Sequence, residues 1–372
     1  MEKLSKNTSI YLDLLRLAAA FCVFMTHSRN FIIPKLPVLL GKYGTEAVAV
    51  FFVLSGFVIS YVVTEKERDW RSYCVARISR IYSVAIVAVI VTTILDYCGT
   101  YINNEQYVLL NDKFGFYRQE NIVSFFRSIT FTNELWFSHV IYGSNEPYWS
   151  LGFEVWYYIL FGAFVFISPK YRLLGVLFVV LFCGIKIIMY FPLWCLGFFA
   201  YKSLKLVDMN RKVAGAIFTA SIIALLSVIF FRKIFHPTEF YITFAISQQV
   251  NNFYYYHLIG VCVAINIITF DRLADGRHIF NTPQEKWIRW AAGASFTLYL
   301  IHQPMEVFTS ALFPEIGNHS LQGVLALFLI IMSVLIFAEL GERRKNYFKA
   351  IVEPMFFRRG KLQPVLGEID NP

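Results

Sequence analysis

The stretch RLAAAFCVFMTH, from Arg16 to His27, decides the fold class. Its interior is apolar or small apart from one threonine, yet both of its ends are polar. The ends are eleven residues apart, which is about three helical turns, so both side chains lie on one face of a helix, about 16 Å apart along its axis. Asp13 lies one turn before Arg16. A polar stripe on an apolar helix indicates a transmembrane segment whose polar face points into the protein.

The composition extends this interpretation to the whole chain. Its 372 residues are 57% hydrophobic and only 16% charged, whereas soluble proteins carry about 25% charged residues. We predict an all-α, polytopic membrane bundle of about ten transmembrane helices. The apolar runs fall at about 10–28, 46–64, 78–98, 148–167, 171–185, 187–201, 213–231, 254–270, 290–311 and 320–340.

The first run also has the basic start and small residues of a cleaved signal peptide. Asp13 and Arg16 would then lie inside its hydrophobic region, which such signals tolerate poorly, so a first transmembrane helix is favoured.

The distribution of lysine and arginine predicts the topology. The net charge of +9 lies mostly in short loops between apolar runs, which indicates membrane orientation and no nucleic-acid surface. Most of the 34 basic residues fall on one side when the N-terminus is inside, so both termini are expected in the cytoplasm. We expect a transmembrane domain over 1–345 and a basic cytoplasmic tail over 346–372. The outward loop 99–147 contains SFFRSITF, which predicts either an amphipathic surface helix or a folded cap.

Ionisable groups at similar depths on three predicted helices indicate a common site. With a rise of about 1.5 Å per residue, His27, Glu154 and His302 lie about 18–25 Å from the inner face. His302 also shares a helix face with Ser295 and Tyr299, because the three are spaced by four and three residues. A histidine beside a carboxylate suits proton transfer near neutral pH. We therefore expect His27 to act as a base and Glu154 to assist it.

Arginines mark the other end of this polar track. Arg77 and Arg80 lie one turn apart at the inner mouth of the third helix, and Arg16 lies about 9 Å into the membrane. Forked guanidinium donors suit phosphate groups, so a phosphorylated donor is expected to enter from inside and a hydroxyl acceptor from outside. Juxtamembrane arginines are also common topology signals, so this pair alone is weak evidence.

The remaining titratable residues indicate no separate chemistry. The six cysteines are scattered and no metal-ligand spacing occurs, so no metal is expected. Four further histidines lie in or near predicted loops and are expected to be structural: His139, His236, His257 and His278.

Five short motifs, in order, resemble those of the acyltransferase 3 family of membrane O-acyltransferases. They are YLDLLRLAAAFCVFMTH, AVFFVLSGFVIS, ARISRIY, WSLGFEVWYY and SFTLYLIHQP. The resemblance covers about residues 9–340. It implies a multi-span enzyme of the bacterial inner membrane that takes an acyl group, usually acetyl, from cytoplasmic acyl-CoA. The acceptor it implies is a hydroxyl of a surface or exported glycan or a lipid-linked sugar.

The resemblance also implies roles for the matched residues. His27 becomes the essential histidine with Arg16 as its partner, and Arg77 and Arg80 become candidates for binding acetyl-CoA. Residues expected to line the site are Ser150, Glu154, Ser295, Tyr299 and His302. Trp149 is expected to stack on a sugar, although membrane interfaces are equally rich in tryptophan.

The sequence departs from the family pattern at three of the motifs. Ala49 and Val50 replace the polar residue often found just before the two phenylalanines, with Glu46 a turn earlier. Val155 replaces the second acid of a paired motif, so only Glu154 can serve there, and Ser83 replaces a proline.

Two other functions fit the polar track. A transporter or flippase for a lipid-linked saccharide would also bury ionisable residues along its path. The sequence has no inverted repeat and no helices broken by Gly or Pro in matching halves, which speaks against a transporter. A structural or regulatory subunit would leave the common depth of the three ionisable groups unexplained.

Overall fold

The computed structural model confirms an all-α fold. It describes residues 4–37, 40–67, 69–114, 122–232 and 253–357. Within these ranges the regular structure is helical, with one isolated bridge between Tyr142 and Asn145 and no strand. The main helices are α1 (Lys6–Phe31), α2 (Gly44–Glu65), α3 (Trp70–Ile102), α4 (Asn104–Phe114), α5 (Ile122–Ile129), α6 (Trp149–Phe166), α7 (Pro169–Cys183), α8 (Ile185–Ser203), α9 (Arg211–Phe230), α11 (Phe253–Ala274), α12 (Thr282–Ala292), α13 (Ser295–Leu312), α14 (Ser320–Leu340) and α15 (Lys345–Phe356). Short 3-10 turns are η1 (Glu146–Tyr148), η3 (Ile316–Asn318) and η4 (Glu342–Arg344).

Eight of the described helices are long and apolar enough to cross a membrane, against about ten expected. The predicted run 171–185 is α7, whose 15 residues span only about 22 Å. The run 290–311 is not one helix: α12 ends at Ala292 and α13 begins at Ser295. The helix α13 is not among the eight, because His302, Gln303 and Glu306 lower its hydropathy. The predicted runs 171–185 and 290–311 are therefore helical, although they are not among the eight. The chain is a multi-pass helical bundle, as expected.

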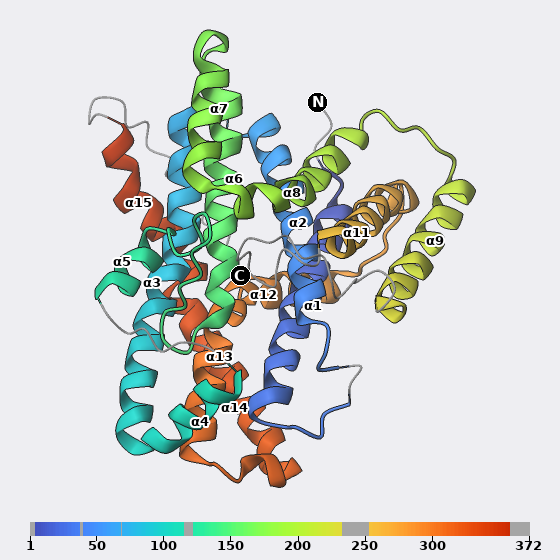
Figure 1. Cartoon of the computed structure of the whole chain (residues 1–372). Helices are drawn as coiled ribbons and strands as arrows, with labels where there is room; N and C mark the ends of the chain where they lie inside the picture. The colour runs from blue at the N-terminus through green and yellow to red at the C-terminus, as the bar shows by residue number, and fades with distance from the viewer. Residues whose placement is uncertain (1–3, 38–39, 68, 115–121, 233–252, 358–372) are drawn as a thin grey trace.

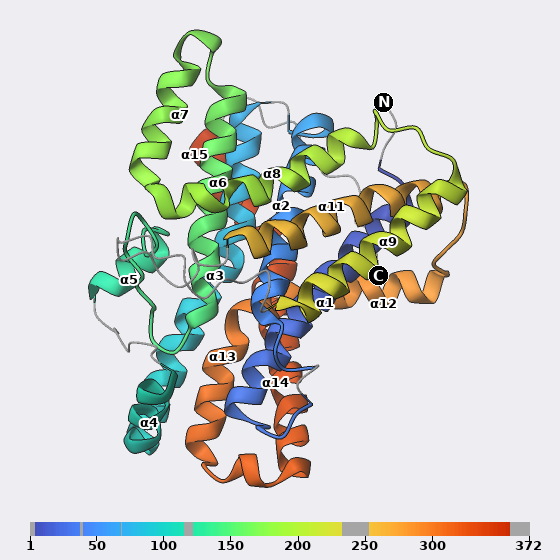
Figure 2. The same ribbon diagram turned by 45° about the vertical axis from the view of Figure 1, so that its right-hand side comes forward.

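The helices alternate in direction (Figures 1 and 2). The α2–α3, α6–α7 and α8–α9 connections lie toward the end of the bundle where α1 begins, whereas the α1–α2 and α13–α14 connections lie at the opposite end. This alternation agrees with the charge distribution along the sequence.

Glycines allow α2 and α8 to pack backbone against backbone. A Cβ atom on Gly56 would lie 1.9 Å from the Trp194 carbonyl oxygen, and one on Gly197 would lie 1.8 Å from the Val53 carbonyl oxygen. Small residues at helix contacts are typical of membrane proteins, where close packing replaces the hydrophobic effect. This contact fixes the position of α2 against α8.

The long loop that is expected to face outward contains both structures considered for it. In α5 the apolar Ile122, Val123 and Phe126 are exposed while Ser124 and Ser128 are buried, as in a helix lying on a membrane surface. The following segment folds as a cap and is held by a buried ion pair between Lys186 Nζ and Glu134 Oε2 at 2.5 Å.

The segment after Leu340 is more ordered than the predicted basic tail. Its described part forms η4 and α15, and α15 packs along α3, with Trp70 and Phe356 rings 6.0 Å apart. Residues 358–372 of the predicted tail lie outside the described residues, as does His236.

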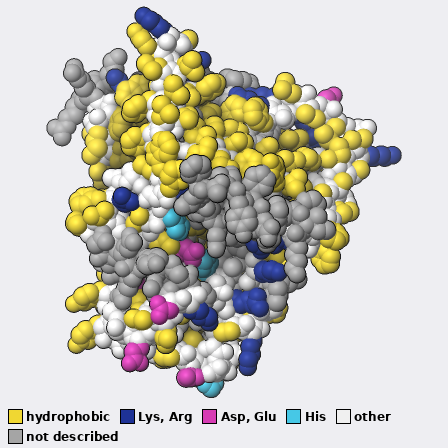
Figure 3. Space-filling view, in the orientation of Figure 1, with side chains coloured by type: hydrophobic (Ala, Val, Ile, Leu, Met, Phe, Trp, Pro, Cys, Tyr) yellow, Lys and Arg dark blue, Asp and Glu magenta, His cyan; other side chains and the backbone are white. Residues whose placement is uncertain are grey.

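The molecular surface suits a lipid environment. Hydrophobic side chains cover much of the upper part of the face in Figure 3, over α7, α8 and α9. Large exposed side chains of α7 and α9 include Leu173, Phe178, Ile223, Leu226 and Phe230. These residues face outward because α7 and α9 bury little against the rest of the bundle.

Candidate active site

One cavity inside the bundle collects polar side chains from five helices. Asp13 and Arg16 enter from α1, Arg77 and Arg80 from α3, and Glu154 from α6. Ser55 of α2, Ser150 and Tyr158 of α6 and Tyr299 of α13 also line it, and the rest of its wall is largely apolar: Leu12, Val48, Phe51, Phe52, Leu54, Val58, Ile59, Ile81, Leu151 and Phe296. We call this cavity the arginine chamber. Six of the predicted site residues, from distant parts of the sequence, line it: Arg16, Arg77, Arg80, Ser150, Glu154 and Tyr299.

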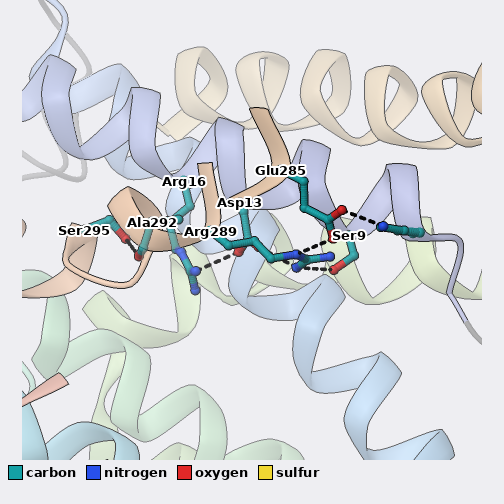
Figure 4. A network of polar contacts seen from close by, with 8 residues as sticks. Ser9, Asp13, Arg16, Glu285, Arg289, Ala292 and Ser295 are labelled. Atoms are coloured by element: carbon teal, nitrogen blue, oxygen red, sulfur yellow. Dashed lines mark hydrogen bonds and ion pairs between the residues drawn. The ribbon is translucent and has the colours of Figure 1, made fainter. Parts of the chain in front are cut away.

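Arg16 is held at the wall of the chamber by an ion network (Figure 4). Its Nη2 atom lies 2.8 Å from Asp13 Oδ1, and Asp13 Oδ2 accepts a bond from Arg289 Nη1 at 3.1 Å. Arg289 also binds Glu285, which pairs with Lys6 at 2.5 Å. Since Asp13 receives bonds from two arginines, this network couples α1 to α12. Figure 4 also shows the Ser295 hydroxyl bonded to the Ala292 carbonyl oxygen, at 2.7 Å.

Arg77 and Arg80 differ in their partners. Arg77 Nη2 donates to Glu67 Oε1 at 2.6 Å, and its guanidinium lies near the Tyr73 and Tyr158 rings. Burial raises the pKa of Glu67, against the opposing effect of Arg77. Among the described residues, the Arg80 side chain has no hydrogen bond or ion pair. Its guanidinium is therefore available for an anion in the chamber.

Glu154 is bound by hydroxyl groups inside the arginine chamber. Ser55 Oγ donates to Glu154 Oε1 at 2.8 Å, and the Tyr158 hydroxyl donates to the same oxygen. Trp194 Nε1 in turn donates to Ser55 Oγ at 3.2 Å. These bonds fix the carboxylate facing the arginines.

The two predicted histidines lie beside one another. The His27 and His302 ring centroids are 5.1 Å apart, with the rings steeply inclined to each other. Tyr299, one turn before His302, shares a hydrogen bond with Ser150 at 2.7 Å, so α13 links the histidine pair to the arginine chamber. His302 Nδ1 contacts the Leu298 carbonyl oxygen at 2.8 Å. In the part of the chain that the structure describes, neither His27 Nδ1 nor His302 Nε2, both buried, has a hydrogen-bond partner.

Three predicted site residues lie differently from expectation. Within the described chain, no hydrogen bond joins Glu154 to either histidine, because Glu154 turns toward Ser55 and Tyr158. Ser295 is fully buried and its hydroxyl is used by α12, so it does not line the chamber. Trp149 lines a separate small pocket with Thr45, Phe52, Tyr190 and Tyr256, and that pocket shares Val48 and Phe52 with the chamber.

The structure adds residues that the sequence interpretation missed. Glu306, one turn after His302, is fully buried and its Oε1 atom lies 2.5 Å from Ser28 Oγ. Its spacing continues the stripe of Tyr299 and His302, so the signal was present in the sequence. Ser55 and Tyr158 contact Glu154, and Tyr158 is one turn from it. Among the described residues no group of three His, Cys, Asp or Glu side chains has metal-binding geometry.

The fold and the chamber define a class: a multi-pass helical membrane protein with a buried chamber of arginines, a carboxylate and hydroxyl groups next to a histidine pair. The family described as "Acyltransferase domain" matches residues 9–339, which is most of the chain. The protein therefore belongs to the acyltransferase 3 family of membrane O-acyltransferases. No curated protein and no solved structure matched the chain.

Proposed function

We propose that this acyltransferase moves an acetyl group from cytoplasmic acetyl-CoA to a hydroxyl of a surface or exported glycan, including a lipid-linked one. We place it in the bacterial inner membrane with both termini in the cytoplasm. The observation that carries the proposal is the joint position of the arginine chamber and the histidine pair, linked through Tyr299. The arginines, which supply positive charge for a phosphorylated donor, lie at one end. The histidines, which can transfer a proton, lie at the other.

The arginines suit the donor. Coenzyme A carries several phosphate groups, which guanidinium groups bind through paired donors. Arg80, without an ion pair of its own in the described chain, supplies the main phosphate contact, and Arg77 and Arg16 add positive charge beside it. The thioester then points along the chamber toward Ser150 and Tyr299.

The histidine pair suits the acceptor. His27 takes the proton of the acceptor hydroxyl as its oxygen attacks the thioester carbon. The C–S bond breaks, and the departing thiolate takes up a proton to leave as free coenzyme A. The Tyr299 and Ser150 hydroxyls supply hydrogen bonds for the oxygen that becomes negative during the attack. One O–H and one C–S bond are replaced by one C–O and one S–H bond.

The side chains around Trp149 suit contact with a sugar, and a whole ring enters only when they move apart, because the cavity between them measures about 30 Å³. Trp149, Tyr190 and Tyr256 present aromatic faces there, and Thr45 adds a hydroxyl. Trp149 and Ser150 are consecutive, so a sugar against the tryptophan lies next to the chamber wall at Phe52. Aromatic side chains provide large rigid contact area with polar edges, which supports the assignment of this pocket to the acceptor.

The test measures free coenzyme A and product together. Membranes containing the protein receive acetyl-CoA and cell-surface polysaccharide, thiol release is followed by a colour reaction, and the acetylated product by mass spectrometry. We expect His27→Ala to reduce both at least about a hundredfold, the low end of general-base contributions. His278→Ala, on an exposed loop, is the matched control and should retain activity. A flippase would release no coenzyme A, and full activity in His27→Ala would remove this residue from the mechanism.

A further inference from the structure

The contact between Ser28 and Glu306 poses a question of proton count. Ser28 Oγ lies 2.8 Å from the Phe24 carbonyl oxygen and 2.5 Å from Glu306 Oε1. A serine hydroxyl carries one hydrogen, so it donates to only one of two acceptors. The carbonyl oxygen has no hydrogen to give. If Ser28 donates to Phe24, as helical serines commonly do, the second contact requires a hydrogen on Glu306.

The surroundings of Glu306 favour the same protonation state. The residue is fully buried, and within the described chain it has no ion pair with lysine, arginine or histidine. Its Oε2 atom is buried and has no hydrogen-bond partner among the residues that the structure describes. An ionised carboxylate with a bare oxygen and no cation is very costly in a low-dielectric interior, whereas a neutral carboxylic acid with one bare carbonyl oxygen costs far less.

Other polar groups near Glu306 do not supply a charge that would change this conclusion. Gln303 lies one turn before it, and both polar atoms of its amide are buried without a hydrogen-bond partner in the described ranges of the chain. Glu146, from η1, faces Gln303 without reaching hydrogen-bond geometry. His302 shares the α13 face with Glu306, and His27 precedes Ser28 on α1.

We propose that Glu306 is a neutral carboxylic acid that donates a hydrogen bond to Ser28 Oγ and thereby positions His27 against His302. The bond joins α1 to α13 next to the level at which the two imidazole rings meet. Glu306 is thus a positioning residue, and the histidine pair works beside an uncharged acid rather than a carboxylate. The protonation state of Glu306 and its bond to Ser28 do not depend on the proposed function. Only the prediction for activity rests on it.

The first experiment detects the proton on Glu306 in the purified full-length protein. Infrared difference spectra compare wild type with Glu306→Gln, and the C=O stretch of a protonated carboxylic acid is expected to disappear in the variant and to shift in deuterium oxide. Glu46→Gln is the matched control, because Glu46 is buried but has Arg232 3.3 Å away and a hydroxyl donor in Tyr255. Its spectrum should lose no such band. Absence of the acid band from the Glu306→Gln difference overturns the proposal.

The second experiment tests positioning through kcat and KM with acetyl-CoA and cell-surface polysaccharide. Glu306→Gln keeps a neutral donor at this position and should retain kcat within about threefold of wild type. Glu306→Ala and Ser28→Ala break the contact and should lower kcat about tenfold with unchanged KM for acetyl-CoA, the effect of about one lost buried hydrogen bond. A wild-type kcat in Glu306→Ala overturns the positioning role. A large loss of kcat in Glu306→Gln shows that Glu306 acts as an ionised carboxylate, which overturns the neutral acid. If wild type releases no coenzyme A, the proposed function fails, while the infrared band still decides the state of Glu306.

Discussion

Arg77 and Arg80 lie one helical turn apart, yet they have different partners. Arg77 forms an ion pair with Glu67, whereas Arg80 has no ion pair in the described part of the chain. The difference matters because a guanidinium that already holds a carboxylate must release it to bind a phosphate. Donor binding should therefore depend more on Arg80 than on its neighbour.

This contrast gives a prediction for donor affinity. Arg80→Gln should raise KM for acetyl-CoA about tenfold, since a hydrogen bond to a charged group contributes about 1.5–3 kcal/mol, with little change in the melting temperature. Arg80→Lys should recover part of this affinity, because lysine keeps the positive charge but lacks the paired N–H donors of a guanidinium group. Arg77→Gln should lower thermal stability, because it leaves Glu67 buried without its cation. An unchanged KM in Arg80→Gln would exclude this residue from donor binding.

At the residue scale the sequence predicted which side chains are polar and buried, but only part of their pairing. The spacing of Ser295, Tyr299 and His302 gave a common face, and the depths of His27 and His302 agree with their contact. Glu154 lines the same cavity as Arg16 but turns toward Ser55, because spacing along one helix does not give its rotation relative to its neighbours. Glu306 was overlooked although it continues the same stripe.

The helix pair α2 and α8 illustrates packing at the element scale. Gly56→Ala should strongly reduce the melting temperature of the detergent-solubilised protein, because its Cβ would lie 1.9 Å from a backbone oxygen of α8 and the helices must separate. Fluorescence-detected size-exclusion chromatography after heating measures the effect. Gly215→Ala in α9 is the control, since its nearest neighbour would lie at 3.6 Å, an ordinary contact. Equal melting temperatures for the two variants would contradict the close α2–α8 contact.

The start of α3 gives a prediction with a pH dependence. Asp69 accepts hydrogen bonds from Ser72 Oγ and from the backbone N–H groups of Arg71 and Ser72. These bonds, those of Ser72 first, lower the pKa of Asp69 below its ordinary value of 3.8. A lowered pKa in the folded state stabilises the protein above the unfolded pKa, and this contribution disappears as pH falls through the folded pKa.

Asp69→Ala should therefore reduce the free energy of unfolding at neutral pH by about 1 kcal/mol, as expected for loss of an N-cap. The difference from wild type should shrink only below pH 3.8. Denaturant titrations at several pH values measure it, with Asp208→Ala, an exposed loop residue, as the control. A difference between wild type and Asp69→Ala that is independent of pH down to strong acid would show that the carboxylate does not act as the cap.

At the element scale the apolar runs were enough to locate the long helices but not all their ends, and they did not include α4 or α15. The predicted run 290–311 is divided because Glu342 accepts the backbone N–H groups of Phe296 and Thr297, which caps a new helix start at Ser295. That cap comes from a residue more than forty positions away in the sequence. The amphipathic α12 then lies separately, tied to α1 through Asp13 and Arg289. Long-range contacts of this kind leave no periodic signal in the sequence.

At the scale of the whole molecule, the arginine chamber and the histidine pair form one polar interior surrounded by apolar helices. Five helices contribute to the chamber, and α1 and α13 contribute to both parts. The basic residues concentrate toward the end where α1 begins, which is the expected cytoplasmic side. Under the proposed function, this interior connects a donor on one side of the membrane with an acceptor on the other.

Sided acyl transfer tests this central claim most directly. Right-side-out membrane vesicles are loaded with radiolabelled acetyl-CoA, cell-surface polysaccharide is added outside only, and label on the external polysaccharide is measured over time. The account predicts transfer by wild type, at least about a hundredfold less by His27→Ala, and unchanged transfer by His278→Ala. Label that reaches polysaccharide only when acetyl-CoA and polysaccharide share one side, or that is undiminished in His27→Ala, would contradict it.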